Sequence, residues 1–187
     1  MKVDRKGRVR YLTSEEEKAL REALDKRNEI SKDHLKPLVI LSLNTGMRRG
    51  EVFNLKWSDI DLRNKVLTVE GDTAKSGQTR HIRLNKEALS TLKNWKTKNN
   101  NEYGYVFPSK AGGRLDNVKK SWTNLLTQAK IGNFRWHDLR HTFASKLAIK
   151  GVPLNTSREL LGHSDLAMTL RYSHLAPDIK SKSVDLL

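Results

Sequence analysis

The chain has 187 residues, enough for one well-buried domain, and its 36 Lys+Arg outnumber 21 Asp+Glu, for a formal net charge of +15. It has no cysteine, which excludes disulfides, thiol catalysis, zinc fingers and iron–sulfur sites. No apolar run approaches the ~18 residues that span a bilayer, and the first twelve residues lack the apolar region of a secretory signal, so we expect no membrane partner. The charge favours a polyanionic partner; nucleic acid is the first candidate, and charge alone also fits a ribosomal or membrane-surface protein.

The N-terminal half predicts helices after a basic start. Residues 1–11 read as an arm or the remnant of a linker. The sequence Thr-Ser-Glu-Glu at 13–16 is a capping box, which is typical of a helix start. A second helix is expected over 34–44 and should end at Gly46 in a left-handed cap, and a third begins near Arg49.

A small sheet and further helices are expected next. Residues 66–69 and 80–84 alternate with period two, so they predict an antiparallel pair of strands, with a short third strand near Ile60. Further helices are predicted over 86–98, 115–130, 137–150, 154–161 and 165–174. The fold class is therefore mainly α with a small three-stranded antiparallel β-sheet (α+β). We place the domain at residues 12–175 and a C-terminal tail at 176–187.

Arg48 and Arg49 break a local rule, because cations at a helix start oppose the helix dipole. A bound anion there would reverse the effect, since free N–H groups and the positive helix end both favour phosphate. The alternative is that both arginines are solvated or pair with Glu51. Local exceptions of this kind concentrate at functional sites.

A second candidate lies in the segment around His137 and Arg140. Three residues apart on a helix, these side chains point the same way, and together they suit a phosphate: arginine grips two oxygens and histidine donates or relays a proton. Two helix-surface residues are the alternative. His163 follows Gly162 in a tight interhelical turn, and Tyr172 comes nine residues later. A lone tyrosine in such a place is usually a packing residue.

The set of residues points to phosphoryl transfer without a metal or cofactor. No Asp/Glu cluster has the spacing of metal ligands, and no Gly-Lys-Ser/Thr phosphate loop is present. Side chains must then neutralise a phosphodiester. Arg48 and Arg140 are suited to hold its two non-bridging oxygens and to stabilise the pentavalent transition state.

Taken together, the motifs resemble the catalytic domain of the tyrosine recombinase (phage integrase) family. The resemblance runs from about Leu12 to Pro177, in the family's order and approximate spacing. The matching segments are Thr-Gly-Met-Arg-Arg-Gly-Glu at 45–51, Thr-Ala-Lys-Ser-Gly-Gln-Thr-Arg at 73–80, His-Asp-Leu-Arg-His at 137–141, Leu-Leu-Gly-His at 160–163 and Met-Thr-Leu-Arg-Tyr at 168–172.

The resemblance implies a role for each matched residue. Tyr172 is the implied nucleophile, and the product is a 3′-phosphotyrosyl link with a free 5′-hydroxyl. Lys75 on a mobile hairpin is the implied general acid, although a solvated hairpin lysine is the alternative. His137 is the implied acid/base partner, and His163 is expected to hydrogen-bond the scissile phosphate. The remaining expectations are supporting roles for Glu51 and His141, and DNA contacts from Arg49, Arg80, Arg83 and Arg171.

The resemblance also implies partners and a setting. The partner is double-stranded DNA, with a tetramer on two duplexes that exchanges a C-terminal segment; a monomer is the alternative for the isolated domain. Family members usually carry an N-terminal DNA-binding domain, so we expect a catalytic fragment of a longer, cytoplasmic, bacterial or phage-encoded integrase, rather than a minimal single-domain member. A type IB topoisomerase-like enzyme and a non-catalytic basic DNA-binding module remain the rival functions.

Overall fold

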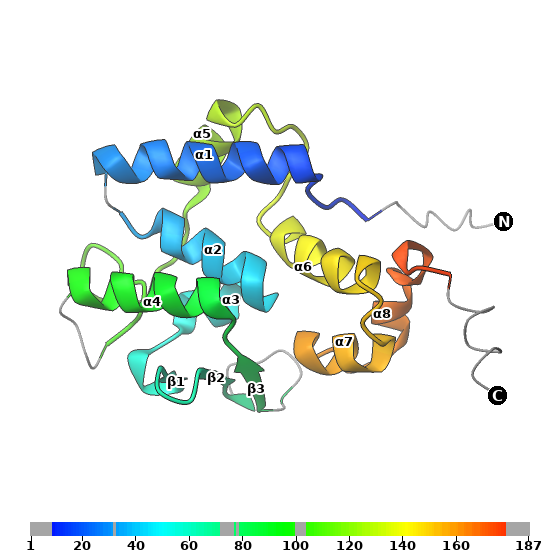
Figure 1. Cartoon of the computed structure of the whole chain (residues 1–187). Coiled ribbons are helices and arrows are strands. Elements are labelled where there is room, and N and C mark those ends of the chain that lie inside the picture. Colours follow the sequence, from blue (N-terminus) through cyan, green and yellow to red (C-terminus); the bar gives the residue numbers. More distant parts are fainter. Residues whose placement is uncertain (1–8, 32, 72–76, 78, 100–103, 179–187) are drawn as a thin grey trace, which may run out of the picture.

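The computed structural model describes residues 9–31, 33–71, 77, 79–99 and 104–178 (Figure 1). Helices dominate, and the strands form one small antiparallel sheet, which confirms the expected fold class. The helices are α1 Ser14–Ser31, α2 Leu35–Thr45, α3 Arg49–Asn54, α4 Lys86–Asn99, α5 Lys119–Gln128, α6 Asp138–Ile149, α7 Leu154–Leu161 and α8 Ala167–Leu170. The strands are β1 Ile60–Asp61, β2 Val66–Val69 and β3 Arg80–Arg83, and 3₁₀ turns cover Trp57–Asp59 and Ser173–Leu175.

Helix α1 begins with the predicted capping box. The Glu16 backbone N–H donates to Thr13 Oγ1 at 3.2 Å, and the Thr13 N–H donates to Glu16 Oε2 at 3.0 Å. Arg10 pairs with the same Glu16 carboxylate and lies over the Phe134 ring, 5.1 Å from its centroid. The Leu12 N–H donates to Thr142 of α6. The described residues just before α1 are thus attached to the domain.

Helix α2 forms the centre of the molecule. Nearly all of its residues are buried, because its apolar side chains surround the helix, and it packs against α4 on one side and α6 on the other. It ends at Gly46, whose φ of 63° is left-handed as predicted. A side chain at Gly46 would also collide with Phe143 of α6, because the added Cβ would lie 2.4 Å from that ring. Glycine therefore permits both the turn and the close approach of α6.

The sheet has the order β1-β2-β3, and both pairs are antiparallel. Leu67 lies opposite Ile82, and both side chains are buried in the main core. Along β3, Arg80 and Ile82 are less exposed than His81 and Arg83, as the period-two pattern predicts. The short strand expected near Ile60 is β1.

The C-terminal helices surround a second, smaller core made of Ala144, Ala148, Leu161 and Tyr172. The helix predicted over 165–174 is wrong in one respect: α8 ends at Leu170, and a separate 3₁₀ turn follows Tyr172. So short a helix has little cooperative stability of its own, and burial of the Tyr172 side chain against α6 decides the local backbone instead. Within the described residues, no helix has the length and apolar character needed to cross a membrane.

Candidate active site

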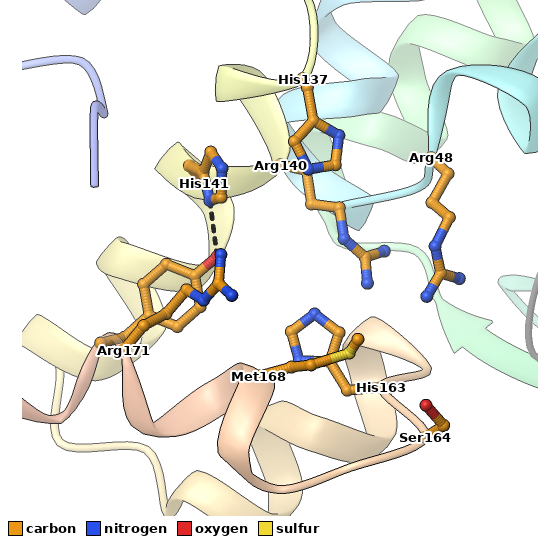
Figure 2. Close-up of a pocket in the computed structure, with 9 residues that line it drawn as sticks. Arg48, His137, Arg140, His141, His163, Ser164, Met168 and Arg171 are labelled. Carbon is orange, nitrogen blue, oxygen red and sulfur yellow. Dashed lines mark hydrogen bonds between the residues drawn. The ribbon is translucent and has the colours of Figure 1, made fainter. Parts of the chain in front are cut away.

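A pocket of about 250 Å³ lies where the start of α3, α6 and the α7–α8 turn meet. Every predicted catalytic residue that the structure describes lines it (Figure 2). The lining residues are Arg48, His137, Arg140, His141, His163, Ser164, Met168, Arg171 and Tyr172. Residues nearly 125 positions apart in the chain are thus brought to one cavity by the packing of α6 against α2 and α7.

Arg48 is held from two sides at the start of α3. Its Nη1 donates to Glu51 Oε1 at 2.9 Å, and its backbone N–H donates to Glu51 Oε2 at 2.7 Å. Its Nη2 donates at 2.9 Å to the backbone carbonyl of Gly162, the residue that caps α7. The predicted pairing of Arg48 with Glu51 is present, and the guanidinium still reaches the pocket (Figure 2).

Arg140 is buried, with 4% of its surface exposed, in the first turn of α6. Its Nη1 donates to the carbonyl of Gly46 at 2.7 Å, and its Nη2 donates to the carbonyl of Leu161 at 2.6 Å. Both carbonyls lie at helix C-termini, where intrahelical partners are missing and the dipole is negative. The guanidinium therefore caps α2 and α7 while facing the cavity.

The two arginines concentrate positive charge without an equal acidic counterpart. Burial, followed by the charge of Arg48, lowers the pKa of Arg140 to about 9, which still leaves it charged at neutral pH. Burial also lowers the pKa of His163 to about 3, and Arg140 and Arg48 act in the same direction. A site that disfavours further protons in this way favours an anion, because the anion's charge relieves the repulsion.

His163 is oriented by a residue that the sequence analysis missed. Its Nδ1 lies 2.8 Å from the hydroxyl Oγ1 of Thr169, which is fully buried in α8. The signal in the sequence was the short spacing, because Thr169 follows His163 by six residues, across the turn between α7 and α8. Such a contact at one ring nitrogen sets the orientation of the other.

Tyr172 is almost completely buried, with 2% of its surface exposed. Its hydroxyl lies 2.7 Å from His141 Nδ1, the contact dashed in Figure 2. Burial raises the pKa of Tyr172, and the charges of Arg171 and Arg140 act in the opposite direction. Burial, followed by His137, lowers the pKa of His141 to about 4, and the two imidazole rings meet edge to face at 4.9 Å between centroids. The tyrosine is thus a neutral phenol bonded to a neutral imidazole.

The remaining predicted residues fall into distinct surroundings. Arg49 and Arg83 are exposed, and Arg171 is exposed at the rim of the pocket. Arg80 differs, because its side chain is only 10% exposed and both terminal nitrogens donate to Glu51, at 3.0 and 2.7 Å. Lys75 lies outside the described residues, so its predicted role stays a prediction. No group of three histidine, aspartate or glutamate side chains within the described ranges is arranged to hold a metal ion.

Comparison with known proteins gives the family. The model of the Phage integrase family matches residues 10–178. The chain belongs to that family. It is 31% identical to a protein of Caldanaerobacter subterraneus named tyrosine recombinase XerC-like, over 96% of this chain and 54% of the relative. It is 34% identical to the integrase of Salmonella phage P22, over 91% of this chain and 45% of that protein.

Solved structures give the same family. The crystal structure of XerA recombinase aligns with a TM-score of 0.75 and 27% identity, over 94% of this chain and 62% of that one. The catalytic domain of bacteriophage HP1 integrase aligns with a TM-score of 0.71 and 25% identity, over 95% of this chain and 94% of that domain. The chain spans about half the length of the curated relatives named above, and it matches the HP1 catalytic domain almost end to end.

Proposed function

We propose that this chain is the catalytic part of a site-specific DNA recombinase or integrase that cleaves and rejoins DNA strands through a 3′-phosphotyrosyl intermediate. The observation that carries the proposal is the placement of one buried tyrosine hydroxyl on a pocket lined by three arginines and three histidines. The names of its relatives, tyrosine recombinase and integrase, support the same reaction. The integrase of transposon Tn1549, a 22% identical protein of the same fold, was solved in complex with circular intermediate DNA.

Binding of the scissile phosphate is the first step. Arg48 and Arg140 donate to its two non-bridging oxygens, with guanidinium groups already fixed by Glu51 and by helix-end carbonyls. His163 adds a hydrogen bond from the ring nitrogen that Thr169 leaves available. Because these donors are held in place before DNA arrives, little reorganisation is needed as negative charge grows in the transition state.

Cleavage then exchanges one phosphodiester for another. Tyr172 Oη attacks the phosphorus, the bond to the 5′ oxygen breaks, and the DNA 3′ phosphate becomes linked to the tyrosine. The phenolic proton passes to His141 Nδ1, its hydrogen-bond partner. The negative phosphate favours protonation of the nearby histidines, which makes this transfer easier than in the free protein. Lys75 supplies the proton to the leaving 5′ oxygen, with His137 as acid/base partner.

Rejoining reverses these steps with a 5′-hydroxyl from another strand. The phosphotyrosyl bond retains the free energy of the broken phosphodiester, so no nucleotide cofactor is needed. We propose a tetramer on two duplexes as the active assembly. Leu166, which precedes α8 at its N-cap, and Leu170 at its end are exposed apolar residues, one helical turn apart, that suit contact with a neighbouring subunit.

A covalent-capture assay tests the proposed nucleophile. The substrate is a pool of duplexes with randomised sequence and a nick in one strand, so that cleavage near the nick releases a short 5′-hydroxyl fragment and traps the protein on DNA. Tyr172→Phe should abolish the denaturant-resistant protein–DNA product while leaving binding nearly unchanged. The substitution removes only the hydroxyl, and the buried ring keeps its packing.

Tyr105→Phe is the matched control, because Tyr105 lies away from the pocket, beside Lys56. Covalent product that persists in Tyr172→Phe would refute the nucleophile, and binding without capture in the parent chain would favour the non-catalytic DNA-binding module. If the parent captures DNA, strand transfer between two separate duplexes distinguishes a recombinase from a topoisomerase-like enzyme, which relaxes one duplex.

A further inference from the structure

Glu51 connects the pocket to the sheet through two arginines. It is 4% exposed and accepts hydrogen bonds from Arg48 on one side and from both terminal nitrogens of Arg80 on the other. Although burial alone would raise the pKa of Glu51, the hydrogen bonds and charge of Arg80, followed by contacts from Arg48, lower it. A buried carboxylate thus stays ionised between two guanidinium groups.

Arg80 also fixes the backbone that Arg48 binds. An added Cβ on Gly162 would lie 2.9 Å from Arg80 Cδ, 3.0 Å from Nε and 3.1 Å from Cζ, so the Arg80 side chain lies directly against this glycine. The carbonyl of Gly162 accepts the hydrogen bond from Arg48 Nη2. Four residues therefore form a closed circuit, in which Arg80 supports both anchors of Arg48: the Glu51 carboxylate and the Gly162 carbonyl.

The position of Arg80 makes this circuit a link between two parts of the fold. Arg80 opens β3, and β3 packs against α7 (Figure 1). Its terminal nitrogens are both bound to a carboxylate, and its Nε is buried with no hydrogen-bond partner among the described residues. The pair of terminal nitrogens is thus occupied by Glu51, and the remaining Nε–H is buried, so this guanidinium is poorly placed to grip a DNA phosphate. This differs from Arg83, which lies on the exposed face of the same strand.

We propose that Arg80 is a positioning residue that holds Arg48 in its phosphate-binding geometry through Glu51 and Gly162, and that it does not contact DNA. The proposal rests on the proposed function, because it assigns Arg80 a part in the same strand-cleavage reaction. Loss of Arg80 leaves Glu51 with Arg48 as its one remaining guanidinium partner in the described structure, so this carboxylate draws Arg48 away from the phosphate. Cleavage slows, while the number of phosphates that the protein neutralises stays the same.

The test compares Arg80→Gln, Arg80→Lys and the control Arg63→Gln. Two quantities are measured for each: the rate of covalent capture at a saturating concentration of a duplex that the parent chain captures, and the salt dependence of DNA binding. Arg63 is exposed in the β1–β2 turn, so this control removes one positive charge from the same sheet without touching the circuit. Arg80→Gln should slow capture by about 10-fold to 100-fold, the range known for loss of a partner that orients a metal ligand. The slope of the logarithm of its DNA-association constant against the logarithm of salt concentration (the salt slope) should equal that of the parent. Arg80→Lys should be intermediate, because lysine provides one contact in place of the fork.

Because Arg80 and Glu51 act through one contact, the effects of replacing them on the capture rate should not add. Glu51→Gln should slow capture as well, and the double variant Arg80→Gln/Glu51→Gln should be no slower than the slower single variant. If Arg80→Gln fails to fold, the capture rate and the salt slope of Arg80→Lys test the proposal instead. A salt slope reduced by about one with an unchanged capture rate would overturn the proposal, because it identifies a phosphate contact. Absence of capture by the parent chain would instead refute the proposed function.

Discussion

At the scale of single residues, the pocket depends on hydroxyl groups that hold two histidines at Nδ1. Thr169 is fully buried, and His163 Nδ1 is the acceptor that the described structure provides for its hydroxyl proton. The hydroxyl therefore donates to Nδ1, and the proton of the neutral ring lies on Nε2, available to a phosphate oxygen. In the same way, His141 Nδ1 accepts a hydrogen bond from the Tyr172 hydroxyl. In the proposed function, each histidine is thereby oriented for a different partner: His163 for the phosphate and His141 for the tyrosine.

The lowered pKa values of these histidines predict how stability depends on pH. The pKa values of His141 and His163 are about 4 and about 3 in the folded protein, below the usual histidine value, so the unfolded chain binds more protons. Their contribution to stability is therefore complete above pH ~6.5 and is lost as the pH falls toward 4. Because solvent screens these half-buried groups, we expect a combined loss of about 2 kcal/mol between pH 7 and pH 5.

Urea unfolding of the parent and of His141→Gln and His163→Gln at pH 7 and pH 5 measures this loss. Each variant should show a smaller decrease in the free energy of unfolding than the parent. His81→Gln is the control, since His81 lies on the exposed face of β3, outside the pocket. An equal decrease in all four proteins would contradict the assignment of the acid sensitivity to the pocket.

At the scale of elements, the ends of helices build the site. The carbonyls that close α2 and α7 bind the arginines, and the turn after α7 carries His163. Both helices end at a left-handed glycine, Gly46 and Gly162, and these caps leave carbonyls directed at the pocket. The caps therefore have a second role beyond ending the helices, because a change in either one moves an arginine.

Gly162→Ala and Gly151→Ala separate these two roles. Both glycines have positive φ, 62° and 73°, so each alanine should lower the free energy of unfolding by about 1–2 kcal/mol. An alanine at 162 also meets Arg80 at 2.9 Å, whereas the nearest atom to a Cβ at 151 is 3.8 Å away, in ordinary contact. Only Gly162→Ala should slow covalent capture at saturating DNA. Equal capture rates in the two variants would show that the α7 cap does not act on the arginines.

At the scale of the whole molecule, the charge of +15 divides into internal and external parts. Arg80 and Arg140 are bound within the fold, whereas Arg49, Arg83 and Arg171 are exposed. Apart from Arg48 and Arg140, which face the scissile phosphate in the proposed function, only the exposed cations are free to follow a DNA backbone. The formal charge thus overstates the number of phosphate contacts.

Salt titration of DNA binding measures this division. The logarithm of the association constant should fall with the logarithm of salt concentration by about 0.9 per phosphate contact, over several contacts. Arg83→Gln and Arg171→Gln should each reduce the slope by about one, with Arg63→Gln measured beside them. A binding constant that does not change with salt would reject the DNA-binding proposal.

Much of the fold could be predicted from the sequence, because it depends on local rules. The capping box at α1, the glycines that end α2 and α7, and the alternation along β2 and β3 each act over a few residues. The segment around Tyr172 could not be predicted in the same way. Its helical pattern is overridden by burial of the tyrosine against α6, a contact between residues about 30 positions apart.

The sequence by itself determined which motif residues were candidates for the site, because the residue types, their order and their spacing are properties of the chain alone. Only the tertiary structure decided which of the described residues meet in one pocket and what each side chain contacts there. Arg80 and Arg83 are equivalent as cations in the sequence, but the strand turns one toward Glu51 and the other outward. Thr169 is an ordinary helix residue until His163 packs against it. Such roles depend on partners brought together by packing, and charge and hydrogen bonding act through space rather than along the chain.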